Sequence, residues 1–352
     1  MEIPDREEPK FDGDQYLPRQ NLRERDMRLF ALNGSEAVGA AVARALSVGL
    51  DPHEERDFED GEHKARPLVS VRGADVYVLH SLGGGAGASV NDRLCKLLFF
   101  LATCRENGAA RVTAIVPYLA YARKDRQTKT RDPVTTRYVA QLFEAVGTDR
   151  IVTLDVHNFA AFQNAFRCES IHLDTRNLFA PAIRDLAGDG PITIFSPDGG
   201  GLKRVQLLKE ALEAGATEDV GFGFMEKRRS GGVVSGDLFA GDVSGTAVFI
   251  VDDMISTGGT MLRAALACRD RGANAVHAIA THALFAKGAE ALLESRGIDR
   301  IIVTDSVATA TLAKAANPSA RLDVLSTGPL IGEAVRRLHS NASISDLLGI
   351  PD

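Results

Sequence analysis

Cysteine is scarce in this chain, and its placement excludes two common kinds of small structural site. Four cysteines occur among 352 residues, at Cys95, Cys104, Cys168 and Cys268, and no two have the C-x-x-C spacing. That scatter argues against a zinc site and against a disulfide framework. We interpret the four as small buried hydrophobic side chains of a protein in a reducing compartment.

Long apolar runs and an excess of positive charge are also missing. No uninterrupted apolar stretch approaches the roughly 20 residues that a membrane helix requires. Residues 1–20 are charged, contain proline and have no apolar core, so we expect no signal peptide. The formal net charge of −6 disfavours a general affinity for nucleic acid or for anionic membranes. We therefore expect a soluble, cytoplasmic protein.

From residue 27 onward, apolar strands alternate with helices, whereas residues 1–26 lack apolar periodicity and predict a flexible extension. The pattern predicts strands at 27–32, 76–80, 112–117, 151–155, 192–195, 220–224, 247–251, 275–280 and 300–304, and helices at 35–46, 91–107, 135–145, 202–214, 260–271 and 286–295. Such alternation is typical of parallel sheets covered by helices on both faces.

The sequence therefore predicts an α/β protein of two doubly wound parallel-sheet domains. The first spans 27–174 and the second 175–330, with the join near 173–181. The last helical segment, 331–348, is expected to return to the first domain. Ligands of such sheets bind at the carboxyl ends of the strands, so the loops after the strands carry the chemistry.

The most informative loop is 251–260 (VDDMISTGGT), where an apolar strand leads into two carboxylates and then a hydroxyl- and glycine-rich turn. Glycines let backbone N–H groups approach a phosphate, and the following helix N-terminus favours an anion. The two aspartates can accept hydrogen bonds from vicinal sugar hydroxyls or hold a metal through water. A solvated, capped turn is the alternative, but two acids at a buried strand end are costly without a partner. The segment predicts a site for a sugar phosphate.

This loop resembles the phosphoribosyl pyrophosphate-binding loop of type I phosphoribosyltransferases, so both predicted domains are expected to be of phosphoribosyltransferase type. Further stretches are similar to ribose-phosphate pyrophosphokinases, in the family's order, over about 28–348. They are 58–62 (FEDGE), 71–75 (VRGAD), 91–92 (ND), 115–126 (IVPYLAYARKDR), 153–158 (TLDVHN), 196–201 (SPDGGG), 227–229 (KRR), 241–243 (GDV), 281–282 (TH), 303–305 (VTD) and 343–346 (SISD). The family makes phosphoribosyl pyrophosphate from ATP and ribose 5-phosphate.

The resemblance implies a role for each matching position. The ribose 5-phosphate site is expected at Asp252, Asp253, Ser256, Thr257, Gly258, Gly259 and Thr260, and the ATP site at Phe58, Asp60, Glu62, Arg123, Lys124 and His157. Mg²⁺ is the implied cofactor, held by His157 and Asp198, and Lys227 and Arg229 are expected to stabilise the transition state. The 58–62 loop is expected to reach across a subunit interface, which implies dimers that build a hexamer.

Each implied role has a simpler structural alternative. Clustered cations at 123–126 suit a triphosphate because Arg matches phosphate oxygens in two-point contacts, but a solvated basic loop has the same composition. A lone histidine is more often structural than a metal ligand, and Mg²⁺ prefers oxygen ligands to imidazole. An isolated Lys-Arg-Arg is more often a surface turn.

Several positions depart from the family pattern. Ser256 replaces an aspartate, Lys124 replaces a glutamine, glycines lengthen the loop at 83–87, and the segment after Lys227 is richer in glycine. We therefore do not expect phosphate activation or ADP inhibition to carry over. Two alternative functions stay open: a phosphoribosyltransferase that consumes phosphoribosyl pyrophosphate, and a non-catalytic homologue that regulates an active synthetase.

Overall fold

The computed structural model describes residues 27–84, 87–214, 220–230, 233–308 and 321–348. Its first half is built on a five-stranded sheet of order β1-β4-β5-β6-β7, in which all neighbours run parallel. The strands are β1 (Met27–Ala31), β4 (Asp75–Leu79), β5 (Arg111–Val116), β6 (Arg150–Leu154) and β7 (Glu169–Leu173). Four helices belong to this half: α1 (Glu36–Leu46), α2 (Val90–Glu106), α3 (Thr135–Ala145) and α4 (Phe159–Ala165).

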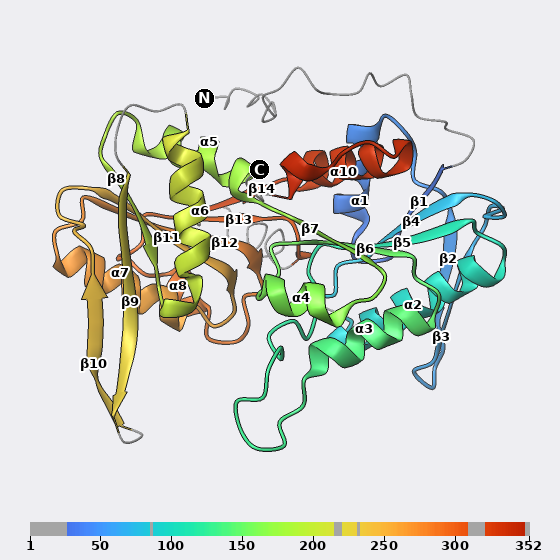
Figure 1. The fold of residues 1–352 in the computed structure, drawn as a ribbon, viewed down its shortest axis with the longest axis horizontal. Coiled ribbons are helices and arrows are strands. Elements are labelled where there is room, and N and C mark those ends of the chain that lie inside the picture. Colours follow the sequence, from blue (N-terminus) through green and yellow to red (C-terminus); the bar gives the residue numbers. More distant parts are fainter. Residues whose placement is uncertain (1–26, 85–86, 215–219, 231–232, 309–320, 349–352) are drawn as a thin grey trace.

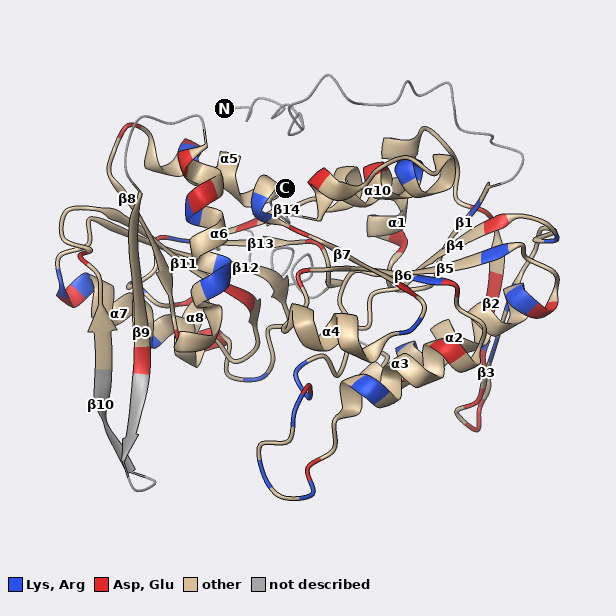
Figure 2. Cartoon of the chain, viewed as in Figure 1, with Lys and Arg blue, Asp and Glu red and all other residues tan. Residues whose placement is uncertain are grey.

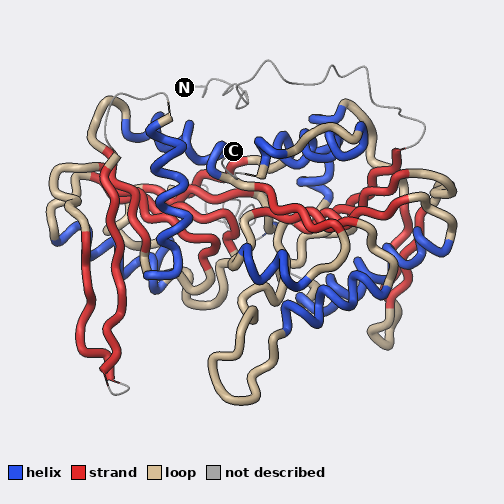
Figure 3. Tube along the Cα trace, viewed as in Figure 1, coloured by secondary structure: helices blue, strands red, loops and turns tan. Residues whose placement is uncertain are grey.

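The second half is built on a seven-stranded sheet of order β10-β9-β8-β11-β12-β13-β14. Its strands are β8 (Ile192–Ser196), β9 (Gly221–Ser230), β10 (Val233–Ala240), β11 (Ala247–Ile255), β12 (Ala275–Ala283), β13 (Arg300–Thr304) and β14 (Leu322–Leu325). Its helices are α5 (Arg176–Ala187), α6 (Leu202–Glu213), α7 (Gly259–Asp270) and α8 (Glu290–Leu293). Helices lie on both faces of each sheet (Figures 1 and 3). The predicted class of two doubly wound α/β domains is confirmed.

The apolar character of the strands explains this layering. Every residue of β4 and β6 is buried, and so are the last five residues of β5, because helices cover both faces of the sheet. The helices present one apolar side to it: in α3, Val139, Ala140 and Phe143 are buried. The start of α2 is set by a reciprocal capping box between Ser89 and Asp92.

Two predicted connections differ from the structure. The strand expected at 220–224 continues to Ser230 as β9, and β10 pairs with it antiparallel at the edge of the second sheet. The join expected near 173–181 is occupied by α5. In α5, Leu178 packs into the core of the first sheet, while Phe179 and Ile183 pack into the core of the second. A packed helix therefore connects the halves. The helix expected at 286–295 is also shorter, because α8 covers only Glu290–Leu293.

The last helix, α10 (Gly328–Ser340), packs on α1 and thereby covers one face of the first sheet (Figure 1). The two helices approach closely because glycine faces alanine: a Cβ on Gly328 would lie 2.5 Å from the Cβ of Ala41, and one on Gly332 would lie 2.7 Å from the Cβ of Ala45. Larger side chains at either glycine would push the helices apart. A 3₁₀ turn, η3 (Ser345–Leu347), follows.

A buried carboxylate anchors α10 to the sheet. Asp75, at the start of β4, accepts hydrogen bonds from Arg111 Nε at 2.9 Å, Tyr77 Oη at 2.9 Å and His339 Nδ1 of α10 at 3.0 Å. Burial opposes ionisation of this group, but the hydrogen bonds from Arg111 and His339 lower the pKa of Asp75 to about 2.

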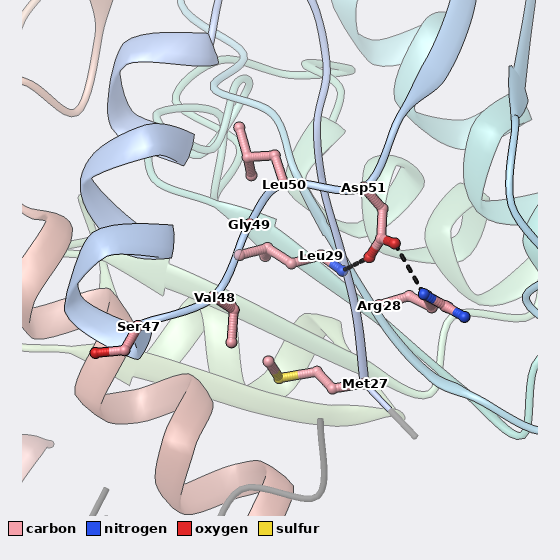
Figure 4. A pocket seen from close by; sticks show the side chains of 8 residues that line it. All are labelled: Met27, Arg28, Leu29, Ser47, Val48, Gly49, Leu50 and Asp51. Atoms are coloured by element: carbon pink, nitrogen blue, oxygen red, sulfur yellow. Dashed lines mark hydrogen bonds and ion pairs between the residues drawn. The ribbon is translucent and has the colours of Figure 1, made fainter. Parts of the chain in front are cut away.

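A shallow hollow of about 440 Å³ lies at the start of β1, far from the carboxyl ends of the strands (Figure 4). Its rim holds an ion pair between Arg28 Nη1 and Asp51 Oδ1 at 3.0 Å, and Asp51 Oδ2 also accepts the Leu29 N–H at 2.9 Å. Both acceptor oxygens of Asp51 are thus used to hold the chain after α1 against β1. We therefore interpret the hollow as a feature of the packing and not as a ligand site.

We predict that Asp75→Asn destabilises the protein in a pH-dependent way. A carboxylate whose pKa is lowered on folding stabilises the fold above its unfolded pKa and loses this effect as pH falls through its folded pKa. A depression from 3.8 to about 2 corresponds to about 2 kcal/mol at neutral pH. Chemical denaturation at pH 7 should show this loss, and the gap to wild type should narrow below about pH 4.

Asp185→Asn, which removes an exposed acid of α5, provides the matched control and should change stability little at any pH. A gap for Asp75→Asn that stays constant from pH 7 to pH 3 would contradict the assignment of the stabilisation to the ionised carboxylate.

Candidate active site

The carboxyl ends of β6 and β11 meet between the two sheets, and charged side chains join them there. His157, just after β6, has its Nδ1 2.9 Å from Asp253 Oδ2 of β11. Arg204 of α6 lies between the same strands, with its Nε 3.2 Å from Asp155 Oδ1 and its Nη1 3.7 Å from Asp252 Oδ1. Two ionic contacts therefore join the halves of the molecule, one from His157 to Asp253 and one from Asp155 to Arg204, which also contacts Asp252.

The two adjacent aspartates differ in environment although both lie within β11. Asp252 keeps 22% of its side chain exposed, whereas Asp253 keeps 2%. The nearest charged partner also differs between the two acids, although the charge of Arg204 acts on both. Asp252 contacts Arg204, and Asp253 contacts His157. The two carboxylates therefore differ both in exposure and in nearest partner.

Burial and mutual repulsion split the ionisation of the two acids. Burial and the neighbouring charge of Asp253 raise the pKa of Asp252 well above its usual range. For Asp253, burial acts in the same direction but is outweighed by the hydrogen bond from His157 and the charge of Arg204, which lower its pKa. The hydrogen bond to Asp253 in turn raises the pKa of His157. Of the two acids, Asp253 is thus the one that stays ionised more readily.

The turn after the acidic pair has the shape that the sequence predicts for an anion site. Gly258, the N-cap of α7, has a φ of 75°, and a Cβ there would lie 2.8 Å from the Cβ of Leu292. Only glycine meets both constraints. The turn ends at the N-terminus of α7, whose free N–H groups favour a phosphate. Ser256 and Thr260 are half-buried beside it, and Thr257 and Gly259 are exposed.

The basic segment after β5 lies on the other side of the same junction. Arg123 and Lys124 are exposed, and the next residue, Asp125, accepts a hydrogen bond from Asn158 Nδ2 at 2.6 Å, which connects the segment to the loop of His157. Burial raises the pKa of Tyr118, while Arg123 and Asp253 act on that ring with opposite signs. Arg123 and Asp253 are therefore both near enough to Tyr118 to influence its ionisation.

Sequence reasoning quoted 153–158 and 281–282 as similar to the family but gave no role to the polar residues there that lie behind these charges. Asp155 Oδ2 accepts the Thr281 hydroxyl at 2.7 Å, and Thr175 lies 2.8 Å from the same hydroxyl. Buried His282 contacts the Leu154 carbonyl at 3.1 Å and Ser306 Oγ at 2.9 Å. The contact of Thr281 with Asp155 and that of His282 with Leu154 each join segments more than 100 residues apart.

Arg204 was missed as well, although its sequence position contains a signal. It is the third residue of α6, where a cation opposes the helix dipole and therefore requires an acidic partner. The charges of Asp155, Asp253 and Asp252 raise the pKa of Arg204 despite its burial, so it stays cationic.

Among the described residues, no hydrogen bond or ion pair joins Asp198 or the 58–62 turn to this junction. Phe58, Asp60 and Glu62 are exposed on the turn between β2 (His53–Asp57) and β3 (His63–Pro67), a hairpin at the far end of the first sheet (Figure 1). The turn is tight: the Glu62 N–H donates to Asp60 Oδ1 at 3.0 Å, and the Phe58 ring lies under Arg56.

Lys227 and Arg229 were expected on a loop, but their backbones belong to β9, which pairs with β10 in a long hairpin. The chain continues as a strand because residues on β10 complete its backbone hydrogen bonds. The side chains of both cations lie outside the described residues. The hairpin and the basic loop between β5 and α3 project from the same side of the molecule (Figure 2).

The surroundings of Asp198 suit a metal ion that is already bound to other ligands, such as the phosphates of a nucleotide. It is exposed after β8, and its Oδ1 accepts the Gly200 N–H at 2.8 Å. Within the described ranges, no group of three or more His, Cys, Asp or Glu side chains could hold a metal alone. Mg²⁺ bound with nucleotide needs only one or two protein ligands, so the donors present suit metal held jointly with phosphates.

Comparisons with known proteins agree with this architecture. Residues 27–147 match the N-terminal domain of ribose phosphate pyrophosphokinase, and 237–349 match the phosphoribosyl synthetase-associated domain. Ribose-phosphate pyrophosphokinase from Vibrio parahaemolyticus is 34% identical over 322 residues, 91% of this chain and 98% of that protein. The Hyphomonas neptunium enzyme of the same name is 33% identical, over 91% of this chain and 99% of its own.

A solved structure is similar over nearly the same length. Phosphoribosylpyrophosphate synthetase from Mycobacterium smegmatis superposes with a TM-score of 0.80 at 31% identity, covering 90% of this chain and 100% of that one. Among the helices that the structure describes, none combines the length and apolarity needed to cross a membrane. Identity above 30% across almost the whole of each relative establishes the relationship: the chain belongs to the ribose-phosphate pyrophosphokinase family.

Proposed function

We propose that this chain transfers the β,γ-diphosphate of ATP to the C1 hydroxyl of ribose 5-phosphate, giving phosphoribosyl pyrophosphate and AMP. One observation carries the proposal: the acidic pair, which directly precedes the anion-binding turn, contacts the loop after β6 through Asp253 and His157 at 2.9 Å. A sugar-phosphate site and a cationic nucleotide site therefore share one junction. The family relationship of the chain supports the same reaction.

The residues divide the two substrates between them. Ser256, Thr257, Gly258, Gly259 and Thr260 bind the 5-phosphate at the N-terminus of α7, as their place in the turn supports. Asp252, the more exposed acid, accepts hydrogen bonds from the ribose hydroxyls. Arg123 and Lys124 bind the ATP phosphates, for which exposed cations on a loop are well suited.

Transfer then needs alignment and charge neutralisation more than a protein nucleophile. The C1 oxygen forms a bond to the β-phosphorus and loses its proton, while the bond from that phosphorus to the α–β bridging oxygen breaks and AMP leaves. Lys227 and Arg229 stabilise the developing charge from the β9–β10 hairpin. His157 and Asp198 would hold Mg²⁺, which when bound neutralises phosphate charge.

The remote hairpin of Phe58 supports a site shared between subunits. Its aromatic ring and acids are exposed and lie far from the junction within one chain (Figure 1). An aromatic ring beside carboxylates suits an adenine, which stacks and donates from its amino group. We propose that this turn completes the ATP site of a neighbouring copy, in dimers that build a hexamer, and that the enzyme acts in the cytoplasm.

Purified protein given Mg²⁺, ATP and ribose 5-phosphate is predicted to release AMP and phosphoribosyl pyrophosphate in equal amounts. Omitting ribose 5-phosphate should abolish AMP release, because no acceptor is then present. Quantitative ion-exchange chromatography of the nucleotides measures both products. Protein that binds ATP without releasing AMP would support the non-catalytic alternative instead, and consumption of phosphoribosyl pyrophosphate with a base would support a transferase.

Lys227→Ala is predicted to lower kcat by roughly 10²–10³-fold with little change in the KM for either substrate, because the cation acts on charge that develops in transfer. Arg296→Ala, which removes an exposed cation after α8, is the matched control and should leave kcat unchanged. Steady-state assays with each substrate varied provide the split. A rise in KM at constant kcat would show that Lys227 binds the ground state.

A mixing experiment tests the shared site. The double variant Phe58→Ala, Asp60→Ala and the variant Lys227→Ala are each expected to be nearly inactive alone. Co-expressed and purified through two different tags, mixed oligomers should exceed the summed activity of both, because some sites then combine an intact hairpin with an intact Lys227. Activity equal to that sum would place all site residues on one chain.

A further inference from the structure

The contact partner of the Asp253 side chain distinguishes it from Asp252, the acid assigned to the ribose hydroxyls. In β11 the Asp252 carboxylate contacts Arg204 at 3.7 Å, whereas the Asp253 carboxylate contacts His157 at 2.9 Å. Asp253 is buried, and its Oδ2 is already bonded to His157. The side chain is thus occupied by a protein partner on the nucleotide side.

The contact determines which ring nitrogen of His157 is available. Asp253 Oδ2 accepts from Nδ1 at 2.9 Å, which places a proton on Nδ1 and directs Nε2 away from the acid. A carboxylate behind a histidine fixes the tautomer and the ring orientation, and so determines what the other nitrogen can bind. The His157 side chain is 42% exposed, so Nε2 is accessible.

The two residues come from different halves of the molecule. His157 follows β6 of the first sheet, whereas Asp253 is embedded in β11, which pairs with β12 beside it and with β8 along its earlier residues. The backbone of Asp253 is held further, because its N–H donates to Asp252 Oδ1 at 2.9 Å. A rigid strand of the sugar-binding half therefore orients a side chain of the nucleotide-binding half.

We propose that Asp253 is a positioning residue that orients His157 toward the nucleotide, and that Asp252 alone of the pair binds the ribose hydroxyls. This inference rests on the proposed function for the identity of the two substrates. It assigns the adjacent carboxylates to different substrates: one binds the acceptor directly, and the other acts on the donor site through a histidine. The link also sets the distance between the sites, since one strand carries both acids.

The two isosteric variants Asp253→Asn and Asp252→Asn separate these roles. For Asp253→Asn, kcat/KM for ATP should fall about 10–100-fold, the usual loss when the partner of a ligating histidine is removed, with the KM for ribose 5-phosphate changed less than about threefold. Asp252→Asn should instead raise the KM for ribose 5-phosphate. If Asp253→Asn raises that KM as much as Asp252→Asn does, the assignment is wrong.

A double-mutant cycle tests whether Asp253 acts through His157. In a His157→Ala background, Asp253→Asn should cost little more, because the ring it orients is gone. Fully additive losses in kcat/KM would overturn the proposal. Thermal unfolding of each variant, compared with wild type, shows whether a loss of activity reflects a loss of folding.

Two readouts do not depend on turnover and so remain valid if the proposed reaction is wrong. In ¹⁵N-histidine-labelled protein, NMR should show His157 protonated at Nδ1 in the wild type and a mixture of tautomers in Asp253→Asn, since an amide can donate as well as accept. Calorimetric binding of ATP, with and without Mg²⁺ and without ribose 5-phosphate, should weaken about 10-fold in Asp253→Asn only. An unchanged tautomer and unchanged ATP affinity would overturn the proposal, even in an active enzyme.

Discussion

The charged contact between the ends of β6 and β11 is the constraint on which the rest of the site depends. Arg204 sits between Asp155 and Asp252, and Asp253 holds His157. Buried carboxylates of like charge repel strongly unless a cation or a hydrogen-bond donor offsets them. Arg204 and His157 supply both, so the two domains are held together by groups that lie at the proposed substrate sites. Removing either partner would leave a buried charge uncompensated.

Buried polar contacts behind this junction limit how the domains can move. Thr281 bonds Asp155 at 2.7 Å, and His282 joins the Leu154 carbonyl to Ser306. Burial lowers the pKa of His282, so the ring stays neutral while bonded on both sides. Separating the two halves of the molecule would break these bonds and expose apolar surface. The β9–β10 hairpin and the basic loop between β5 and α3 project from the body of the molecule (Figure 1).

Most of the fold could be predicted from local pattern, and most of the site's contacts could not. The helix expected at 135–145 is α3 to the residue, since its apolar positions repeat at helical spacing. The anion-binding turn was also readable, because Gly258 needs its positive φ and lies directly before a helix. By contrast, β9 extends far beyond the prediction because its second half is stabilised by pairing with β10, which no local propensity encodes. The bond from Arg204 to Asp155, 49 positions away in the chain, exists only because two sheets meet.

The acidic pair shows where stricter use of strand geometry improves a functional prediction. Read as a motif, Asp252 and Asp253 form one unit for one sugar. Read as strand residues, the two side chains leave the backbone in opposite directions, because the side-chain period of a strand is two. The strand continues to Ile255, past both acids, so the second reading applies. The two adjacent acids accordingly have different nearest partners, Arg204 for Asp252 and His157 for Asp253. Under the proposed function, a single strand would then place both substrates relative to each other.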